Sequence, residues 1–186
     1  MKSRKQRLSI VLTLIAALVL LVSGVASALA PAADGYFHTG TAMRTKSIAF
    51  ISVKVYSIRH DMKQLPPQKS KRAIIDMATD KKFTWTMMRD VPSEKIKNAM
   101  REAFQMNGYR DGGKIERFVG AFNQGEVKEH SAVQIRYEAD KKTTTIWVQN
   151  GASVTIEGEE FMRAVWSIWF GNIDPPSIGD DLMRNL

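Results

Sequence analysis

The residues of this chain that could carry out chemistry are few, and none of their spacings matches a catalytic or metal-binding pattern. Its three histidines, His38, His60 and His130, lie far apart and form no H-x-x-H or H-E-x-x-H motif. The acid pairs at 159–160 and 180–181 are consecutive, so on a helix each pair points in two directions and suits general acid–base chemistry poorly. We therefore expect no catalytic residue, no metal and no cofactor.

Motifs for nucleophiles and phosphate binding are also missing from the sequence. The 186 residues include no cysteine, which excludes disulfides, thiolate metal sites and a lipoprotein anchor. No G-x-S-x-G, Walker-type or G-x-G-x-x-G string occurs. The sequence therefore favours a fold that depends on its hydrophobic core.

The formal charge of +8 is weak support for binding nucleic acid. Four of the 27 basic residues lie within residues 1–7, and the other 23 face 19 acidic residues. No RGG, zinc-finger or RNP-like string accompanies this small excess. We expect no nucleic-acid partner.

Residues 1–30 have the layout of a secretory signal. Basic residues precede an uncharged apolar run of 15 residues at 8–22, and small residues follow up to Ala30. This run is shorter than the roughly 20 residues that span a membrane comfortably. We predict a signal peptide over 1–30, cleaved near Ala28–Ala30, and an exported, periplasmic domain over 34–186. The alternative is an uncleaved segment that anchors the chain, and only this segment is then expected to touch a membrane.

Hydrophobic periodicity predicts strands and helices in the remaining chain. Alternation predicts two strands within residues 36–60, and the aromatic and threonine content of KFTWTMM predicts another. Further strands are predicted in SAVQIRYEA, TTTIWVQN and ASVTIEG. Between the last two, Asn150-Gly151 indicates a type I′ hairpin turn. Helices are predicted for KRAIIDMA, for residues 89–108 with Asp90 as a cap, and for GKIERFVGAFNQG. This mixture is typical of an α+β domain.

A strongly apolar stretch, FMRAVWSIWFG, lies at residues 161–171. Its hydrophobic residues have helical spacing, with two acids in the first turn and a glycine just past the end. Eleven residues span roughly 16 Å, about half a bilayer, which argues against a membrane helix. We predict a nearly engulfed helix, with Met162 and Trp166 bordering a narrow apolar cleft. Its sheet-facing stripe would comprise Phe161, Val165, Ile168 and Trp169.

Four segments resemble the chalcone isomerase-like family, in particular its exported bacterial members. They are GTAMRTKSIAFISVKVYSI, RDVPSEKIKNAMREAF, VQNGASVTIEGEEFMRAVWSIWFG and DDLMRNL. The resemblance implies an α+β fold, in which helices pack on one face of a large, curved antiparallel sheet and a ligand cleft lies between the layers. The elements predicted from periodicity agree with this fold class.

The resemblance also implies where a site would lie. The arginine that orients the phenolate in true chalcone isomerases corresponds to Arg44, in the string GTAMR. The family's polar partners fall on or near residues that cannot supply the same hydrogen bonds. These are Ile51 in place of a Thr, Pro92 in place of a Tyr, Ala99 in place of an Asn, and Met162 in place of a Ser or Thr. Because lost donors remove transition-state stabilisation, the resemblance favours binding over catalysis.

We therefore predict a small apolar ligand with an acidic head, as in the family's fatty-acid-binding branch. Arg44 would pair with the ligand's carboxylate or phenolate through its guanidinium fork. Lys54, Tyr56, Met162 and Trp166 are the other predicted ligand contacts. Two alternatives stay open: an isomerase or intramolecular lyase of chalcone isomerase type, and a structural or protein-partner module with a filled core. For Arg44 itself, the alternative is a structural arginine paired with an acid.

Overall fold

A six-stranded antiparallel sheet forms the framework of the molecule in the computed structural model, which describes residues 29–48 and 50–186. The predicted signal peptide lies outside the described residues, except for its last two positions. The strand order is β1-β2-β3-β6-β7-β8. The strands are β1 Phe37–Ile48, β2 Ile51–Met62, β3 Lys81–Met87, β6 Ala132–Glu138, β7 Thr143–Val148 and β8 Ser153–Glu157, with β4 Val91–Pro92 and β5 Glu126–Val127 forming a separate pair.

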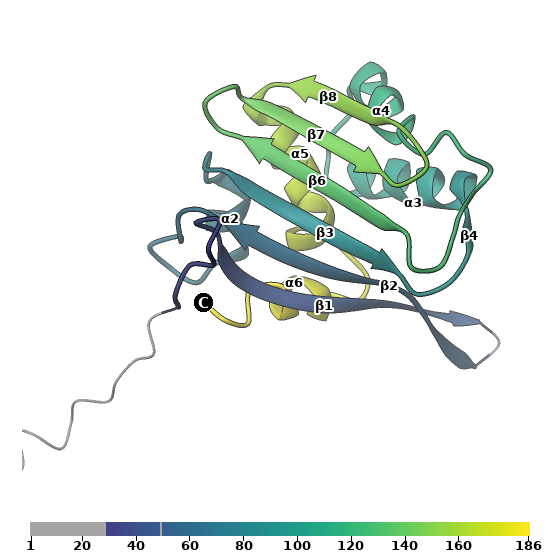
Figure 1. Cartoon of the computed structure of the whole chain (residues 1–186), viewed down its shortest axis with the longest axis horizontal. Coiled ribbons are helices and arrows are strands. Elements are labelled where there is room, and N and C mark those ends of the chain that lie inside the picture. The colour runs from purple at the N-terminus through teal and green to yellow at the C-terminus, as the bar shows by residue number, and fades with distance from the viewer. Residues whose placement is uncertain (1–28, 49) are drawn as a thin grey trace, which may run out of the picture.

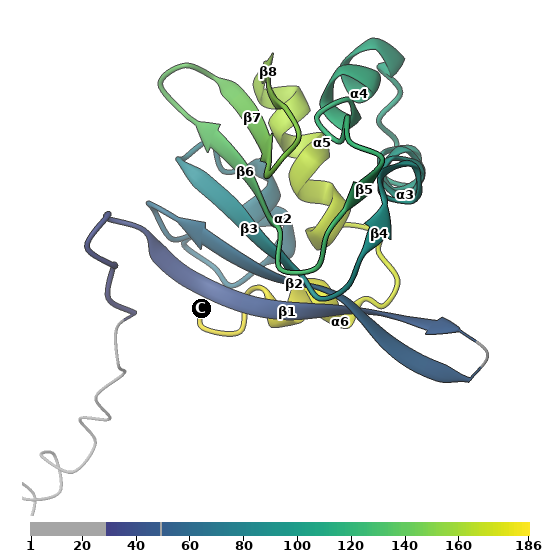
Figure 2. The ribbon, with the colours of Figure 1, turned by 45° about the vertical axis from the view of Figure 1, so that its right-hand side comes forward.

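Helices cover one face of this sheet, as Figure 1 shows. They are α2 Lys71–Asp76, α3 Ser93–Met106, α4 Gly112–Val119, α5 Glu159–Phe170 and α6 Ser177–Asp181. Helix α5 crosses behind the middle of the sheet, while α3 and α4 lie beyond it at one side (Figures 1 and 2). The predicted α+β architecture, with helices on one face of a large antiparallel sheet, is confirmed.

The two faces of the sheet follow from the alternation of side chains along each strand. In β3, Phe83, Trp85 and Met87 point to the helices and are buried, whereas Thr84 and Thr86 point to the open face. Each strand thus contributes one apolar side to the core and one polar side to solvent. This division explains why alternation in the sequence predicted most of the strands.

Helix α5 is the centre of the core, with eight of its 12 residues buried. Trp166 and Trp169 face the sheet, where their rings lie 5.0 and 4.6 Å from the ring of Phe83. Phe161 instead packs against Phe104 of α3 and Phe118 of α4. The engulfed helix is confirmed, but the predicted stripe is wrong in placing Phe161 on the sheet, because α3 and α4 bury the side of α5 on which it lies.

No helix in the described part of the chain is long and apolar enough to cross a membrane.

Two local predictions at element ends need correction. Asp90 does not cap α3, since Pro92 occupies that position and Asp90 accepts hydrogen bonds from the Glu129 amide and Lys128 Nζ at 2.8 and 3.0 Å. The competing contact is tertiary and is therefore invisible in local sequence. The second concerns Asn150 and Gly151, which do not form a type I′ turn.

The β7–β8 turn needs its glycine for close packing. Asn150 has the left-handed φ of 60° expected for a type I′ turn, but Gly151 is not among the residues with positive φ. A Cβ at Gly151 would lie 2.5 Å from Gln124 Oε1 and 2.6 Å from the Ala121 carbonyl oxygen. The segment that follows α4 therefore requires glycine at this position.

Strands β1 and β2 form a long hairpin that extends beyond the rest of the molecule in both views (Figures 1 and 2). Its base is part of the sheet, where β2 pairs with β3 from Tyr56 to Met62. Its outer part, on the far side of Val55, pairs only within the hairpin. An irregularity in the pairing after Arg44 marks the boundary between the two parts.

Candidate functional site

Arg44 lies where the hairpin joins the sheet, on the side that faces the helices. It is opposite Tyr56 in the β1–β2 register, as Ala42 is opposite the fully buried Ile58 one step further in. The guanidinium is only partly exposed, and its Nη1 is buried with no hydrogen-bond acceptor among the described residues. No acidic residue in the described chain forms an ion pair with it. The alternative interpretation, a structural arginine paired with an acid, therefore finds no acidic partner among the described residues.

Tyr56 connects this arginine to the aromatic core. Its hydroxyl oxygen accepts a hydrogen bond of 3.1 Å from Nε1 of Trp169, and its ring stacks on Trp85 with centroids 4.9 Å apart. Burial raises the pKa of Tyr56, and the hydrogen bond from Trp169 and the charge of Arg44 only partly oppose this effect. The phenol therefore keeps its proton at neutral pH.

Arg44 and Tyr56 each carry a hydrogen-bond donor without an acceptor among the described residues. Within the described residues no protein group accepts a hydrogen bond from the Tyr56 hydroxyl, so its proton is as free to donate as Arg44 Nη1. A positive charge and a neutral donor, both partly withdrawn from water, suit a carboxylate or a phenolate.

Lys54 is separated from this arrangement by the irregular pairing. It is opposite Thr45, two residues before Tyr56, and its side chain is exposed. A long exposed ammonium at this distance can add positive charge near the site but is not held in one position. The prediction that Lys54 contacts a ligand stays a prediction.

Met162 and Trp166 are fully buried in the core. The indole of Trp166 is occupied, because its Nε1 donates to His60 at 2.9 Å. Met162 precedes Trp169 by seven residues, or about 10 Å along the helix axis, so it lies towards the other end of α5 from the Tyr56 contact. The structure brings Arg44 and Tyr56 together and does not add Met162 to them.

Sequence reasoning does not assign Trp169 and Trp85 to this site. It places Trp169 in the core stripe of α5, and Trp85 only within a strand. The one available signal is the aromatic content of KFTWTMM and of α5, which does not say which rings meet Tyr56.

The residues that replace the family's polar site do not gather around Arg44. Ile51 is exposed at the far end of the hairpin, Ala99 is exposed on α3, and Pro92 is exposed at the start of that helix. Met162 is buried inside α5. None of the four can donate a side-chain hydrogen bond to a carbonyl group held by Arg44.

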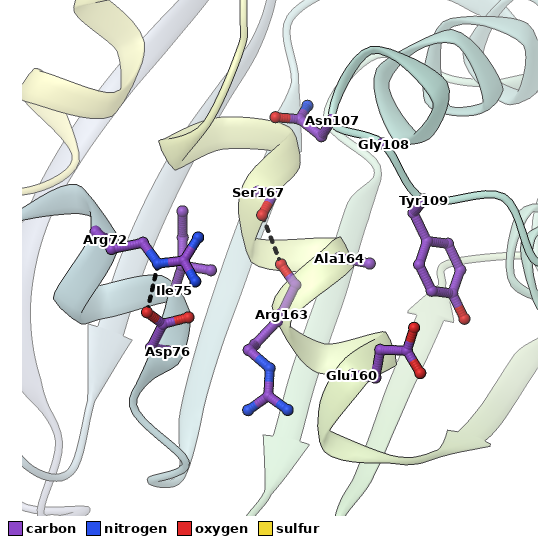
Figure 3. Close-up of a pocket in the computed structure, with 10 residues that line it drawn as sticks. All are labelled: Arg72, Ile75, Asp76, Asn107, Gly108, Tyr109, Glu160, Arg163, Ala164 and Ser167. Carbon is purple, nitrogen blue, oxygen red and sulfur yellow. Dashed lines mark hydrogen bonds and ion pairs between the residues drawn. The ribbon is translucent and has the colours of Figure 1, made fainter.

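A separate hollow of about 170 Å³ lies on the other side of α5, between α2 and the segment that joins α3 to α4 (Figure 3). Three of its four charged side chains have ion-pair partners, since Arg72 pairs with Asp76 and Arg163 with Glu159, whereas Glu160 has none among the described residues. The Ser167 hydroxyl donates to the Arg163 carbonyl at 2.8 Å. This hollow therefore offers few free donors or acceptors.

A second hollow, of about 400 Å³, is bordered by Met106 and residues 171–174 and 176. Neither hollow reaches Arg44 or Tyr56. Among the described residues, no group of three His, Asp or Glu side chains could hold a metal ion.

Comparisons with known proteins agree with this architecture. A family model described as chalcone isomerase-like matches residues 34–177. Among solved structures, a fatty-acid-binding protein of Arabidopsis thaliana superposes with a TM-score of 0.66 at 14% sequence identity, covering 84% of this chain and 90% of that protein. No curated protein sequence matches the chain. The solved structure is similar to this chain in fold.

Proposed function

Since this chain belongs to the chalcone isomerase-like family, we propose that it binds, without converting, a small apolar molecule that carries an acidic head. A fatty-acid-like molecule fits this description. The single observation that carries the proposal is the buried Nη1 of Arg44, which has no acceptor among the described residues and belongs to the residue opposite Tyr56 in the β1–β2 register.

The acidic head would take both free donors. Arg44 Nη1 and the Tyr56 hydroxyl would each donate to one carboxylate oxygen, which satisfies a buried donor that otherwise costs roughly 1–3 kcal/mol. Because the Tyr56 pKa is raised, the phenol stays neutral and does not repel the anion. An acidic head group thus removes the free-energy cost of the unsatisfied Arg44 donor. This favours an acid as the ligand over an alcohol or an ester.

The apolar body would lie against the rings that surround Tyr56. Trp85 and Trp169 form a cluster with centroids 5.3 Å apart beside the phenol. Neither hollow reaches this point, so the body enters the layer between β2 and α5 only when side chains there move apart. Each Å² of apolar surface buried in that layer contributes roughly 25 cal/mol.

Two comparisons support binding over catalysis. The structurally similar Arabidopsis protein is a fatty-acid-binding protein, and it shares this fold over most of both chains. The positions that resemble the family's catalytic partners hold Ile51, Pro92, Ala99 and Met162. A site with one cation and no side-chain donor at these four positions can hold an anion but gives little transition-state stabilisation.

Trp fluorescence provides a direct test, because two of the four tryptophans border the proposed body site. Titration with a long-chain fatty acid should quench the emission saturably. Arg44→Ala should weaken binding by about 1.5–3 kcal/mol, the usual value of a hydrogen bond to a charged group, which is on the order of tenfold to over a hundredfold in Kd.

Arg110→Ala is the matched control, since Arg110 is exposed and lies outside the hairpin. It should bind the acid as the unchanged protein does. The methyl ester of the same acid should bind weakly to all three proteins. Equal affinity of the unchanged protein and Arg44→Ala for the acid would remove Arg44 from the site, and no quenching at all would favour a structural or protein-partner module.

We also propose that the protein is exported to the periplasm, with residues 1–30 as its cleaved signal. The basic, apolar and small-residue regions of that segment support this proposal. Mass spectrometry of protein isolated from its host would find a new N-terminus near Ala28–Ala30. An intact Met1 in the membrane fraction would instead show an anchor.

A further inference from the structure

The tip of the β1–β2 hairpin presents two large apolar side chains to solvent. Phe50 and Ile51 are 107% and 67% exposed, more than any other large hydrophobic residue in the described chain. They are adjacent and lie at the end of an element that extends away from the body in both views (Figures 1 and 2). Phe50 is fully exposed and Ile51 is mostly exposed, so folding of the chain gains little from their hydrophobicity.

The same hairpin carries most of the net charge of the part of the chain that the structure describes. Residues 37–62 contain four basic side chains and one acidic side chain, whereas the other residues from Leu29 onwards contain 19 basic and 18 acidic side chains. Lys46 and Lys54 are the basic residues nearest the tip, and both are exposed. An apolar tip with a basic collar is therefore a local feature of this element.

The spacing of the two features matches the depth profile of a lipid surface. Lys46 and Lys54 each lie four residues from Phe50, which is roughly 13 Å at about 3.3 Å per strand residue. Interfacial apolar groups reach about 5–10 Å into the boundary between headgroups and acyl chains. When Phe50 and Ile51 reach that boundary, the two ammonium groups stand at the level of the lipid phosphates or just outside it.

We propose that this tip inserts into the surface of a bilayer that contains anionic phospholipid, with Phe50 and Ile51 among the acyl chains and Lys46 and Lys54 on the headgroups. A stable protein partner fits less well, because a tip with two large apolar side chains is far smaller than the roughly 800 Å² per partner of a stable protein interface. The contact is distinct from residues 1–30, and it holds whether or not that segment is removed.

The absence of cysteine allows a specific probe of the tip. Ser52→Cys introduces a single thiol beside Phe50 and Ile51 while keeping both side chains, and it can be labelled with the environment-sensitive fluorophore NBD. The full-length protein is mixed with vesicles of phosphatidylcholine and phosphatidylglycerol, 3:1, and the bound fraction is collected by sedimentation. The NBD emission of bound protein should shift to the blue and be quenched by doxyl-labelled lipid.

Three variants of the labelled protein separate the contributions. Phe50→Ser with Ile51→Ser should lose the shift, and Lys46→Glu with Lys54→Glu should lose most of it. A label at Lys141→Cys, in the exposed turn between β6 and β7, should report water in every case. Vesicles of phosphatidylcholine alone should give little shift at Ser52→Cys, because the lysines then lack their partners.

Several outcomes would overturn the inference. A bound protein whose label at Ser52→Cys still reports water would show that residues 1–30 alone hold the chain. A blue shift that rises with protein concentration and without lipid would identify a second copy of this chain as the partner. No fatty acid is present in this experiment, so its result does not depend on the ligand proposed for Arg44 and Tyr56.

Discussion

Nε1 of the Trp166 indole donates a hydrogen bond to Nε2 of His60 at 2.9 Å and joins two residues that are 106 positions apart. The other ring nitrogen of His60, Nδ1, lies 2.6 Å from the Thr39 hydroxyl. Because Nε2 accepts, the neutral ring must carry its proton on Nδ1 and donate it to Thr39. The Thr39 hydroxyl then donates to the Leu182 carbonyl at 2.7 Å. This buried chain of hydrogen bonds connects β1, β2, α5 and the end of α6.

His60 should make the protein sensitive to mild acid. Burial, and then the charge of Lys81, hold the pKa of His60 well below its ordinary 6.5. Below about pH 6.5 the unfolded chain therefore binds a proton at His60 that the folded chain does not bind. This contribution to the stability of the fold is fully present above about pH 6.5 and is lost as the pH falls. We expect the free energy of unfolding to fall by up to about 1.4 kcal/mol per pH unit below that point from this residue alone.

Urea unfolding at several pH values between 5 and 7.5 would measure this slope. His60→Gln cannot gain a proton and should flatten the curve, although it lowers stability overall. His130→Gln is the control, because His130 is exposed and should leave the slope unchanged. If His60→Gln and the unchanged protein have parallel curves, His60 is not the group that titrates.

Lys81 should make the free energy of unfolding depend on pH in the alkaline range as well. The residue is fully buried, with Nζ donating to the Ile74 and Ile75 carbonyls at 2.7 and 3.2 Å. Burial lowers its pKa from 10.5 to about 7. Between those two values the unfolded chain holds a proton that the folded chain has released, so stability should rise with pH from about 7 towards 10.

Chemical denaturation at pH 7.5, 8.5 and 9.5 would show this rise, and Lys81→Met should remove it. Lys141→Met, a change at an exposed lysine, should keep it. Measurements should stay below pH 10, because burial raises the pKa of Tyr109 to about 12 and tyrosine ionisation then opposes folding. A rise that persists in Lys81→Met would assign it to another group.

The protein should not close the ring of a chalcone. The reaction needs a held water and oriented donors near the carbonyl, and Ile51, Pro92, Ala99 and Met162 supply none. Purified protein followed by absorbance with a chalcone substrate should give the uncatalysed rate. A clear rate that is lost in Arg44→Ala and kept in Arg110→Ala would establish an isomerase and reverse this conclusion.

The helices and strands could be predicted from the sequence because each element buries one face. Its apolar residues therefore recur at a regular spacing. Tyr56, Ile58 and His60 of β2 alternate inwards, and Met100 and Phe104 share one face of α3. The contacts that define the candidate site leave no such trace. The pairing of Arg44 with Tyr56 depends on the irregular register beside them, and the hydrogen bond from Trp169 to Tyr56 depends on where α5 crosses the sheet.

The same limit explains the local errors. Asp90 has the sequence context of a cap because capping is a short-range preference, but a partner 39 residues away competes for its carboxylate. Gly151 has the context of a turn glycine, whereas its small size is needed against Gln124 and Ala121. Phe161 has the same spacing as the sheet-facing residues, and only the position of α3 and α4 decides that it faces helices.

Gly40 should be essential for seating α6 on β1. A Cβ at this position would lie 2.2 Å from the Asp181 carbonyl oxygen and 2.7 Å from the Leu182 carbonyl carbon, and both are backbone atoms that cannot rotate away. Two hydrogen bonds hold the C-terminal segment against β1 at this point. The Thr39 hydroxyl donates to the Leu182 carbonyl at 2.7 Å, and the Asn185 backbone amide donates to the Thr39 carbonyl at 2.9 Å. One added methyl group must therefore displace the C-terminal segment or shift β1.

We expect Gly40→Ala to lower the free energy of unfolding by at least about 1–3 kcal/mol, the usual cost of overpacking a core. Gly125→Ala is the matched control, because a Cβ there meets no atom within 4 Å and its φ is not in the left-handed region. Urea unfolding gives the size of the loss, and faster removal of C-terminal residues by carboxypeptidase would show that α6 has separated from β1. If Gly40→Ala is as stable as Gly125→Ala and equally resistant, the backbone of α6 has room to move, and its close contact with β1 contributes little to the fold.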